Sequence, residues 1–138
     1  MIILNFAEPL TSEDISAVAA MHGRRVRQVL GAPAAFSPDL PLAPQVKRLL
    51  DGLGLSRKDW QTMSLVVCLP EESAAAAVLV AEIAGRRGRT PTVVRFRTDG
   101  ATGRREPSEV ISLHEVRKEA QQSSKGWIPP ANHRDSDN

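Results

Sequence analysis

The sequence contains a single cysteine, Cys68, and no tyrosine. One cysteine excludes an internal disulfide and any zinc cluster built from several cysteine ligands. Cys68 lies in the apolar run 64–70, where no basic residue is near in sequence, so we expect a small core residue and not a reactive thiol. Three phenylalanines and two tryptophans are too few for a platform that stacks the bases of a long nucleic acid. We therefore expect no long nucleic acid as a partner.

Long apolar runs are also missing. No stretch approaches the roughly 20 apolar residues of a membrane span. Met1 leads directly into an apolar segment without the basic region of a signal peptide, so we expect a cytoplasmic protein with no membrane partner. Residues 5–11 contain no glycine, and no P-loop is present, which disfavours NAD, FAD and ATP hydrolysis. We expect no cofactor.

The order of apolar segments predicts the fold class. A chain of 138 residues is long enough for one domain with its own core. Strands are expected at 2–6, 25–31, 64–70, 91–97 and 108–113, and helices at 11–22, 43–53, 56–63 and 71–87, with a further helical turn or two at 114–122. The alternation predicts a single small Rossmann-like α/β domain over residues 1–122, with a mainly parallel sheet and helices on both faces. Residues 123–138 have the composition of a disordered tail.

Several helix ends are marked by their own residues. Thr11 and Ser56 are expected N-caps, and Ser73 is explained by capping of the helix that follows it. Gly23 and Gly54 are expected to stop the helices that precede them.

In such a sheet, ligands bind outside the carboxyl ends of the strands. That rule selects Asn5, Phe6 and Thr11, then the loop from Pro70 to Ser73, then Arg95 and Arg97. Helix N-termini and arginines both favour a phosphate, so we expect a mildly basic ligand rim. Glu71 and Glu72 count against an anion there, and arginines more often only solvate a surface.

No catalytic residue is identified. His22, His114 and His133 are scattered along the chain, and none has a partner that spacing places beside it. No cluster of metal ligands is present either, so we expect no metal. The residues alone leave open a compact phosphate ligand, an interaction module, and an enzyme acting on a phosphorylated metabolite.

Three segments carry a resemblance to a known family. They are "MIILNFAEPLT", "PLAPQVKRLLDGLGLSRKDWQT" and "AAAAVLVAEIAGRRGRTPTVVRFR", within residues 1–97. In this order they resemble a small CRISPR-associated accessory family of type III systems, the fifteenth of the Csx series. The resemblance implies a CARF-like fold and a link to cyclic oligoadenylate signalling. The expected ligand is cyclic tetra-adenylate, which the protein would sequester or cut slowly without a metal.

The resemblance also gives roles to the predicted site residues. Asn5 would hydrogen-bond a ribose hydroxyl or an adenine edge, because its amide both donates and accepts. Phe6 would stack on a base or belong to the core, and Thr11 would cap a helix whose amides face a phosphate. Because the ring is symmetric, we expect a homodimer or a larger stack around it. The segment "CLPEES" after the third strand departs from the family pattern. The alternative is a module that docks on a CRISPR effector without binding nucleotide.

Overall fold

The computed structural model describes residues 1–31 and 33–124. Within them, one sheet has the strand order β2-β1-β3-β4-β5. β1 to β4 are parallel, and β5 is antiparallel to β4. The strands are β1 (Ile2–Asn5), β2 (Gln28–Leu30), β3 (Leu65–Cys68), β4 (Thr92–Thr98) and β5 (Arg105–Ser112). The helices are α1 (Ser12–His22), α2 (Leu42–Asp51), α3 (Arg57–Thr62), α4 (Ser73–Arg87) and α5 (Leu113–Ser123). The predicted mainly parallel α/β fold is confirmed.

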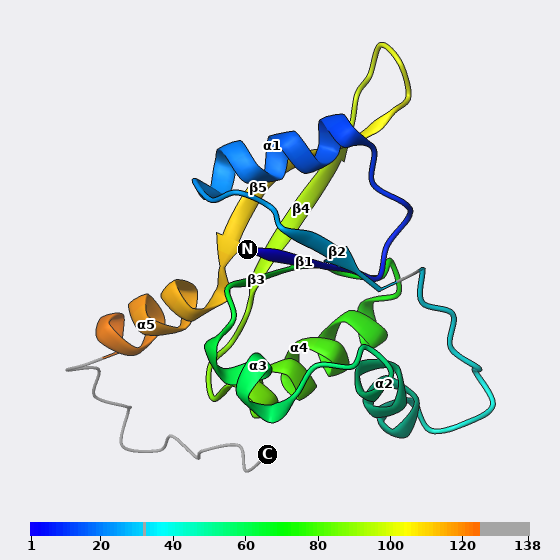
Figure 1. Cartoon of the computed structure of the whole chain (residues 1–138), viewed down its shortest axis with the longest axis vertical. Helices are drawn as coiled ribbons and strands as arrows, with labels where there is room; N and C mark the ends of the chain where they lie inside the picture. Colours follow the sequence, from blue (N-terminus) through cyan, green and yellow to red (C-terminus); the bar gives the residue numbers. More distant parts are fainter. Residues whose placement is uncertain (32, 125–138) are drawn as a thin grey trace, which may run out of the picture.

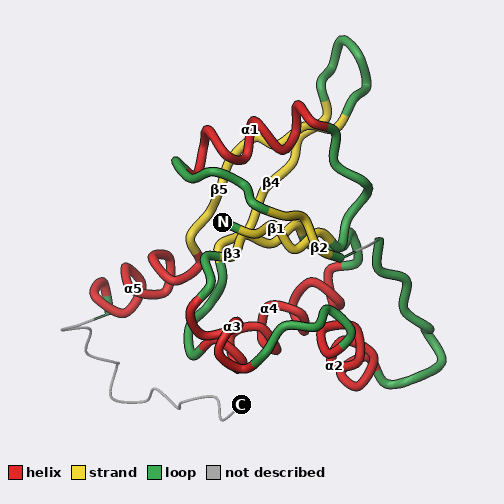
Figure 2. The backbone as a smooth tube through the Cα atoms, viewed as in Figure 1, coloured by secondary structure: helices red, strands yellow, loops and turns green. Residues whose placement is uncertain are grey.

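The sheet lies between two helical layers (Figures 1 and 2). α1 covers one face, and α2, α3 and α4 cover the other. Successive residues of a strand point to opposite faces, so Ile3 and Val66 join Val18 of α1, while Leu4 packs in the cluster that contains Leu50 and other residues of α2, α3 and α4. Strands buried on both faces need the unbroken apolar sequence that predicted them. Helices on both faces are therefore confirmed.

Most predicted helix ends are confirmed. Thr11 and Asp14 form a capping box at the start of α1, Gly23 ends that helix at φ 73°, and Ser56 caps α3 in the same way as Thr11. Ser73 does not cap α4, because Ser73 is the first residue of the helix and Glu72 occupies the N-cap position. The side chain of Glu72 makes no capping hydrogen bond either. The predicted role of Ser73 as a cap is wrong.

Two helices differ in length from the prediction. α2 ends at Asp51, and Gly52 closes it by donating its amide to the carbonyl of Arg48, so Gly54 lies beyond the helix. α5 has 11 residues, about three turns, instead of one or two. At its start the hydroxyl of Ser112 accepts a hydrogen bond from the amide of Glu115. Ser123 is the last residue of α5, so the predicted start of the tail at residue 123 is one residue too early. From residue 125 onward, the predicted tail lies outside the described residues. No described helix has the length and apolar character that crossing a membrane requires.

The strand order creates a switch point in the middle of the sheet. From β1 the chain first adds β2 on one side and then β3 on the other. We call the edge where β1 to β4 end the carboxyl edge, and the edge where they begin the amino edge. In this class of fold, the crevice between the two strands at the switch point is the usual ligand site. Here it lies at the carboxyl edge, between the ends of β1 and β3.

Candidate functional site

A hollow of about 220 Å³ lies at the switch point and is the candidate site. We call it the switch hollow. Its lining comes from the ends of β1 and β3 and from the segment after β2: Phe6, Ala7, Glu8, Pro33, Ala34, Phe36, Pro70, Glu71 and Glu72. A second hollow of about 440 Å³ shares Pro33, Ala34 and Phe36 and adds Gln45, Arg48 and Leu49. The structure thus brings the predicted residues Phe6 and Pro70 together.

Asn5 shapes the loop that leaves β1. Its side chain donates to the carbonyl of Glu8 at 2.9 Å and accepts from the amide of Ala7 at 3.1 Å. The residue is only 5% exposed. Both ends of its amide are thus used within the loop, and Asn5 holds Ala7 and Glu8 in place at the hollow. Its predicted bond to a ribose or an adenine stays a prediction.

Phe6 is a core residue whose position depends on a close approach of the chain after β2. It is 1% exposed. Gly31 has φ +98°, and a Cβ there would lie 2.6 Å from the carbonyl oxygen of Asn5 and 3.3 Å from the ring of Phe6. Ala34 then donates its amide to the carbonyl of Phe6. The structure favours the core role of Phe6 over the stacking role.

Gln45 orders the loop beside the second hollow. Its side chain accepts from the amide of Ser37 and donates to the carbonyls of Ser37, Leu40 and Pro41. These bonds close the loop onto the first turn of α2. Our interpretation of the sequence gave Gln45 no role, although it belongs to the segment "APQV" in the family resemblance.

The N-terminus of α4 is open at the carboxyl edge. No side chain caps it, and its first residue, Ser73, is exposed. The first amides of a helix lack partners within the helix and carry partial positive charge. Since Glu71 and Glu72 line the switch hollow directly before this helix, the open amides lie beside the hollow.

The N-terminus of α1 is occupied by the chain itself. Arg104, in the loop between β4 and β5, donates to the Thr11 hydroxyl at 2.8 Å, to Glu13 at 2.7 Å and to Asp14 at 3.0 Å. Thr11 also accepts the amide of Asp14. A phosphate at Thr11 would have to approach two carboxylates that already hold an arginine. The predicted contact of Thr11 with a phosphate stays a prediction.

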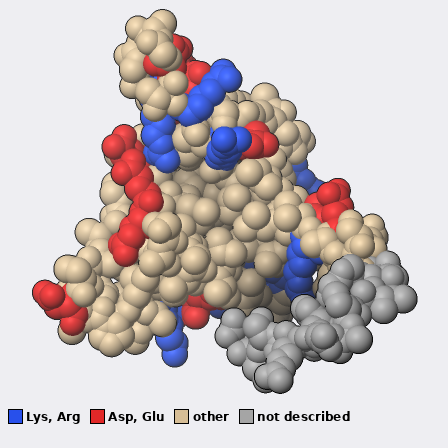
Figure 3. Space-filling model, turned by 180° about the vertical axis from the view of Figure 1, so that it is seen from behind, with Lys and Arg blue, Asp and Glu red and all other residues tan. Residues whose placement is uncertain are grey.

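Arg95 and Arg97 pair with glutamates across the β4–β5 hairpin. Arg95 contacts Glu109 at 3.1 Å, and Arg97 contacts Glu106 at 3.0 Å. Basic and acidic side chains lie side by side near the hairpin at the top of Figure 3. Neither arginine lines the switch hollow. Their role as phosphate ligands stays a prediction, and each would have to leave a carboxylate to fulfil it.

The charges around the switch hollow correct the expectation of a basic rim. Glu8, Glu71 and Glu72 line it, while Arg48 lines only the adjoining hollow. The sequence pointed to Glu71 and Glu72 but gave no sign of Glu8. Glu8 lines the hollow because hydrogen bonds of the Asn5 side chain bend the loop after β1 back toward it. The lining is therefore acidic, and only the open amides of α4 favour an anion.

Catalytic groups are sparse at this edge. Cys68 is fully buried, and burial raises the pKa of its thiol to about 12, which confirms an inert core residue. His22 ends α1 at the amino edge, and His114 follows β5; neither lines the switch hollow. Within residues 1–31 and 33–124, no three His, Cys, Asp or Glu side chains are grouped to hold a metal ion.

Comparison of the chain with protein-family models, with curated proteins and with solved structures finds no match.

Proposed function

We propose that the protein binds cyclic tetra-adenylate at its carboxyl edge and lowers the free concentration of this messenger by sequestration. The observation that carries the proposal is the switch hollow, which lies beside the open N-terminus of α4. Its position in a mainly parallel sheet is the one at which this class of fold binds ligands. The resemblance of residues 1–97 to the type III accessory family supplies the identity of the ligand.

The size of the hollow supports an assembly of at least two copies. About 220 Å³ is less than the roughly 300–1,000 Å³ of pockets that bury a drug-sized ligand, and a ring of four nucleotides is larger than such a ligand. One copy therefore covers only part of the ring. Two copies related by a two-fold axis offer it two identical edges. We expect a homodimer or a larger stack, and light scattering with and without the ring tests this; a strict monomer in both would contradict it.

Sequestration is favoured over cleavage by the groups that line the site. Cutting the ring without a metal requires an aligned ribose hydroxyl, donors for the developing charge and, for speed, a general base. The open amides of α4 are donors, but no histidine lines the switch hollow. The candidate bases there are the carboxylates Glu8, Glu71 and Glu72, which repel the phosphate that they would have to approach. We therefore expect tight binding and at most slow cleavage.

The binding experiment uses two serines that hold equivalent positions. Ser73 and Ser12 are each the first residue of a helix, α4 and α1. Ser73→Asp places a carboxylate at the open amides, where it stabilises the helix by about 0.3–1 kcal/mol and competes with a phosphate. Ser12→Asp makes the same change at the N-terminus that Arg104 already occupies. Isothermal titration with the ring should show roughly five- to tenfold weaker binding for Ser73→Asp, from a repulsion of about 1 kcal/mol or slightly more, and little change for Ser12→Asp.

The fate of the ring is then measured directly. Excess protein is incubated with radiolabelled ring in EDTA and denatured, and the products are separated. Recovery of intact ring supports sequestration, whereas rapid multiple-turnover conversion to linear di-adenylate overturns it. If the wild-type protein binds no ring at all, the proposal fails and a module that docks on an effector becomes the better account.

A further inference from the structure

The amino edge of the sheet has two hollows lined by arginines. One, of about 700 Å³, is formed by Met1 and residues 24–27 at the start of β2. The other, of about 270 Å³, lies where β3 and β4 begin and is lined by Arg24, Arg87 and Arg89 together with Thr62, Ser64 and Thr92. Arg24 belongs to both hollows, which makes them parts of one surface. We call it the amino-edge basic surface.

The positive charge of this surface lacks acidic partners. Arg86, Arg95, Arg97 and Arg104 each pair with a carboxylate. In the part of the chain that the structure describes, no ion pair includes Arg24, Arg25, Arg27, Arg87 or Arg89. Arginines are common near helix C-termini, where they complement the dipole. Here α1, α3 and α4 all end, but three partial negative charges of about one half each do not balance five arginines.

Arg87 is the most informative of the five. It is 8% exposed, and its Nη1 donates to the carbonyls of Trp60 and Met63 at 2.9 Å each. Its Nε is buried and has no partner among the described residues. Burial, and then the charge of Arg89, lowers the pKa of Arg87. A buried charge is costly unless an opposite charge compensates it. The surface thus holds a buried cation whose counter-ion is not supplied by the described residues.

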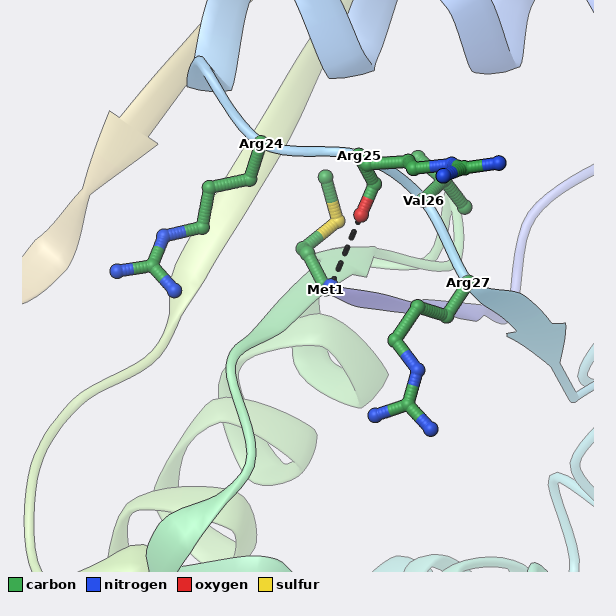
Figure 4. A pocket seen from close by; sticks show the side chains of 5 residues that line it. All are labelled: Met1, Arg24, Arg25, Val26 and Arg27. Atoms are coloured by element: carbon green, nitrogen blue, oxygen red, sulfur yellow. Dashed lines mark hydrogen bonds between the residues drawn. The ribbon is translucent and has the colours of Figure 1, made fainter.

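The side chains at the start of β2 are arranged around a shared space. Figure 4 shows the guanidinium groups of Arg24 and Arg27 extending to the same side of the segment, with Met1 between them, while Arg25 extends to the other side. The terminal amine of Met1 donates to the carbonyl of Arg25 at 2.9 Å, which holds the segment against β1. Because the two guanidinium groups lie apart, a ligand that contacts both has to extend past Met1.

We propose that the amino-edge basic surface binds a ligand with two or more phosphate groups, one between Arg24 and Arg89 and another along Arg24 and Arg27. The guanidinium fork suits bidentate contact with phosphate oxygens. The hydroxyls of Thr62, Ser64 and Thr92 add neutral donors to the smaller hollow. The lining offers no aromatic ring for a base, so the phosphates carry the recognition. The site lies at the opposite edge from the switch hollow and does not depend on the proposed function.

The test uses fluorescein-labelled linear hexa-adenylate RNA in an anisotropy titration. Arg24→Gln/Arg89→Gln should weaken binding roughly ten- to hundredfold, the loss typical of hydrogen bonds to a charged group. The dependence of log K on log salt should become shallower by about two, one for each lost phosphate contact. Both arginines are exposed, so the variant should keep its fold, and a thermal melt checks this. Lys47→Gln/Lys58→Gln is the matched control, because it removes the same charge from exposed residues of α2 and α3 that line neither hollow.

The proposal is overturned if hexa-adenylate does not bind, or if the control weakens binding as much as the arginine variant. Competition identifies the source of the phosphates. Displacement by ATP means that a single phosphate chain is enough, whereas displacement by unlabelled hexa-adenylate alone means that the site binds a phosphodiester backbone. The ring is titrated against the same variants. If ring binding falls with Arg24→Gln/Arg89→Gln and not with Ser73→Asp, the amino-edge site stands and the carboxyl-edge placement of the ring fails.

Discussion

The carboxyl edge and the amino edge of the sheet differ in both shape and charge. The carboxyl edge has the switch point, the switch hollow and the open N-terminus of α4, but the charged residues that line this hollow are glutamates. The amino edge has the C-termini of α1 and α4 and five arginines without a described acidic partner. The strand order thus predicts a ligand site at the carboxyl edge, whereas the arginines favour a phosphate site at the amino edge. A ligand site inferred from strand order therefore has to be checked against the charges of the side chains that line it.

The largest change in the free energy of unfolding should come from a substitution of Phe6, at the carboxyl edge. Phe6→Ala should lower the free energy of unfolding by about 3–5 kcal/mol, because it removes a fully buried ring from the core. Urea denaturation measures this loss. Phe6→Leu keeps most of the apolar volume and should fold and bind the ring. A stable Phe6→Leu protein with sharply weaker ring binding would instead show that the aromatic ring contacts a base.

A smaller loss is expected from Gly31→Ala. The new Cβ would lie 2.6 Å from the carbonyl oxygen of Asn5 at φ +98°, and a non-glycine residue in such a conformation costs about 1–3 kcal/mol. Gly85→Ala is the matched control, because Gly85 lies inside α4 with nothing within 4 Å of its Cβ position. That change should stabilise the protein by about 0.5–1 kcal/mol. Equal melting temperatures for the two variants would contradict the close approach at the switch point.

The fold was predictable wherever the signal is local. Apolar runs gave β1 and β3, and Thr11 with Gly23 marked both ends of α1. The site was less predictable, because its contacts join residues that are distant in the chain. Arg104 reaches Thr11 from 93 positions away, and no spacing rule connects them. The basic residues were visible as clusters, but only the tertiary structure shows that Arg24 and Arg89 share one hollow while Arg95 and Arg97 pair with glutamates.

The negative charge of the carboxyl edge can be reduced by neutralising the glutamates that line the switch hollow. Glu71→Gln/Glu72→Gln should raise the affinity for the ring roughly five- to thirtyfold, since each unit charge about 4 Å away contributes about 1 kcal/mol in water, and two are removed. Glu115→Gln/Glu119→Gln, on α5, removes the same charge away from the switch hollow and should leave the affinity unchanged. The gain should shrink as salt is raised. An unchanged affinity in the first variant would place the ring elsewhere.

The smallest expected effect concerns His22, at the amino edge. Burial, then Arg24 and then the terminal amine, lowers the pKa of His22 below 6.5. The unfolded chain therefore takes up this proton at a higher pH than the folded protein does. The contribution of neutral His22 to the free energy of unfolding is therefore complete above pH 6.5. It is lost as the pH falls through the lower pKa that His22 has in the folded protein. Urea denaturation as a function of pH measures this loss.

The arginine contribution to that shift can be separated from burial. In an NMR titration, Arg24→Gln should raise the pKa of His22 but leave it below 6.5, because burial is the larger cause. Arg117→Gln, on α5, is the control and should leave the pKa as it is. A His22 pKa that does not respond to Arg24→Gln would show that the positive charge of the amino edge does not reach α1.

The most direct test of the central claim is to map the ring on the protein by backbone amide NMR. Spectra are recorded with and without cyclic tetra-adenylate under conditions that keep it intact. Binding at the carboxyl edge predicts the largest shifts at residues 6–8, 33–36 and 71–76, with small changes at 24–27 and 87–92. Shifts confined to residues 24–27 and 87–92 would contradict the account and move the ring to the amino edge.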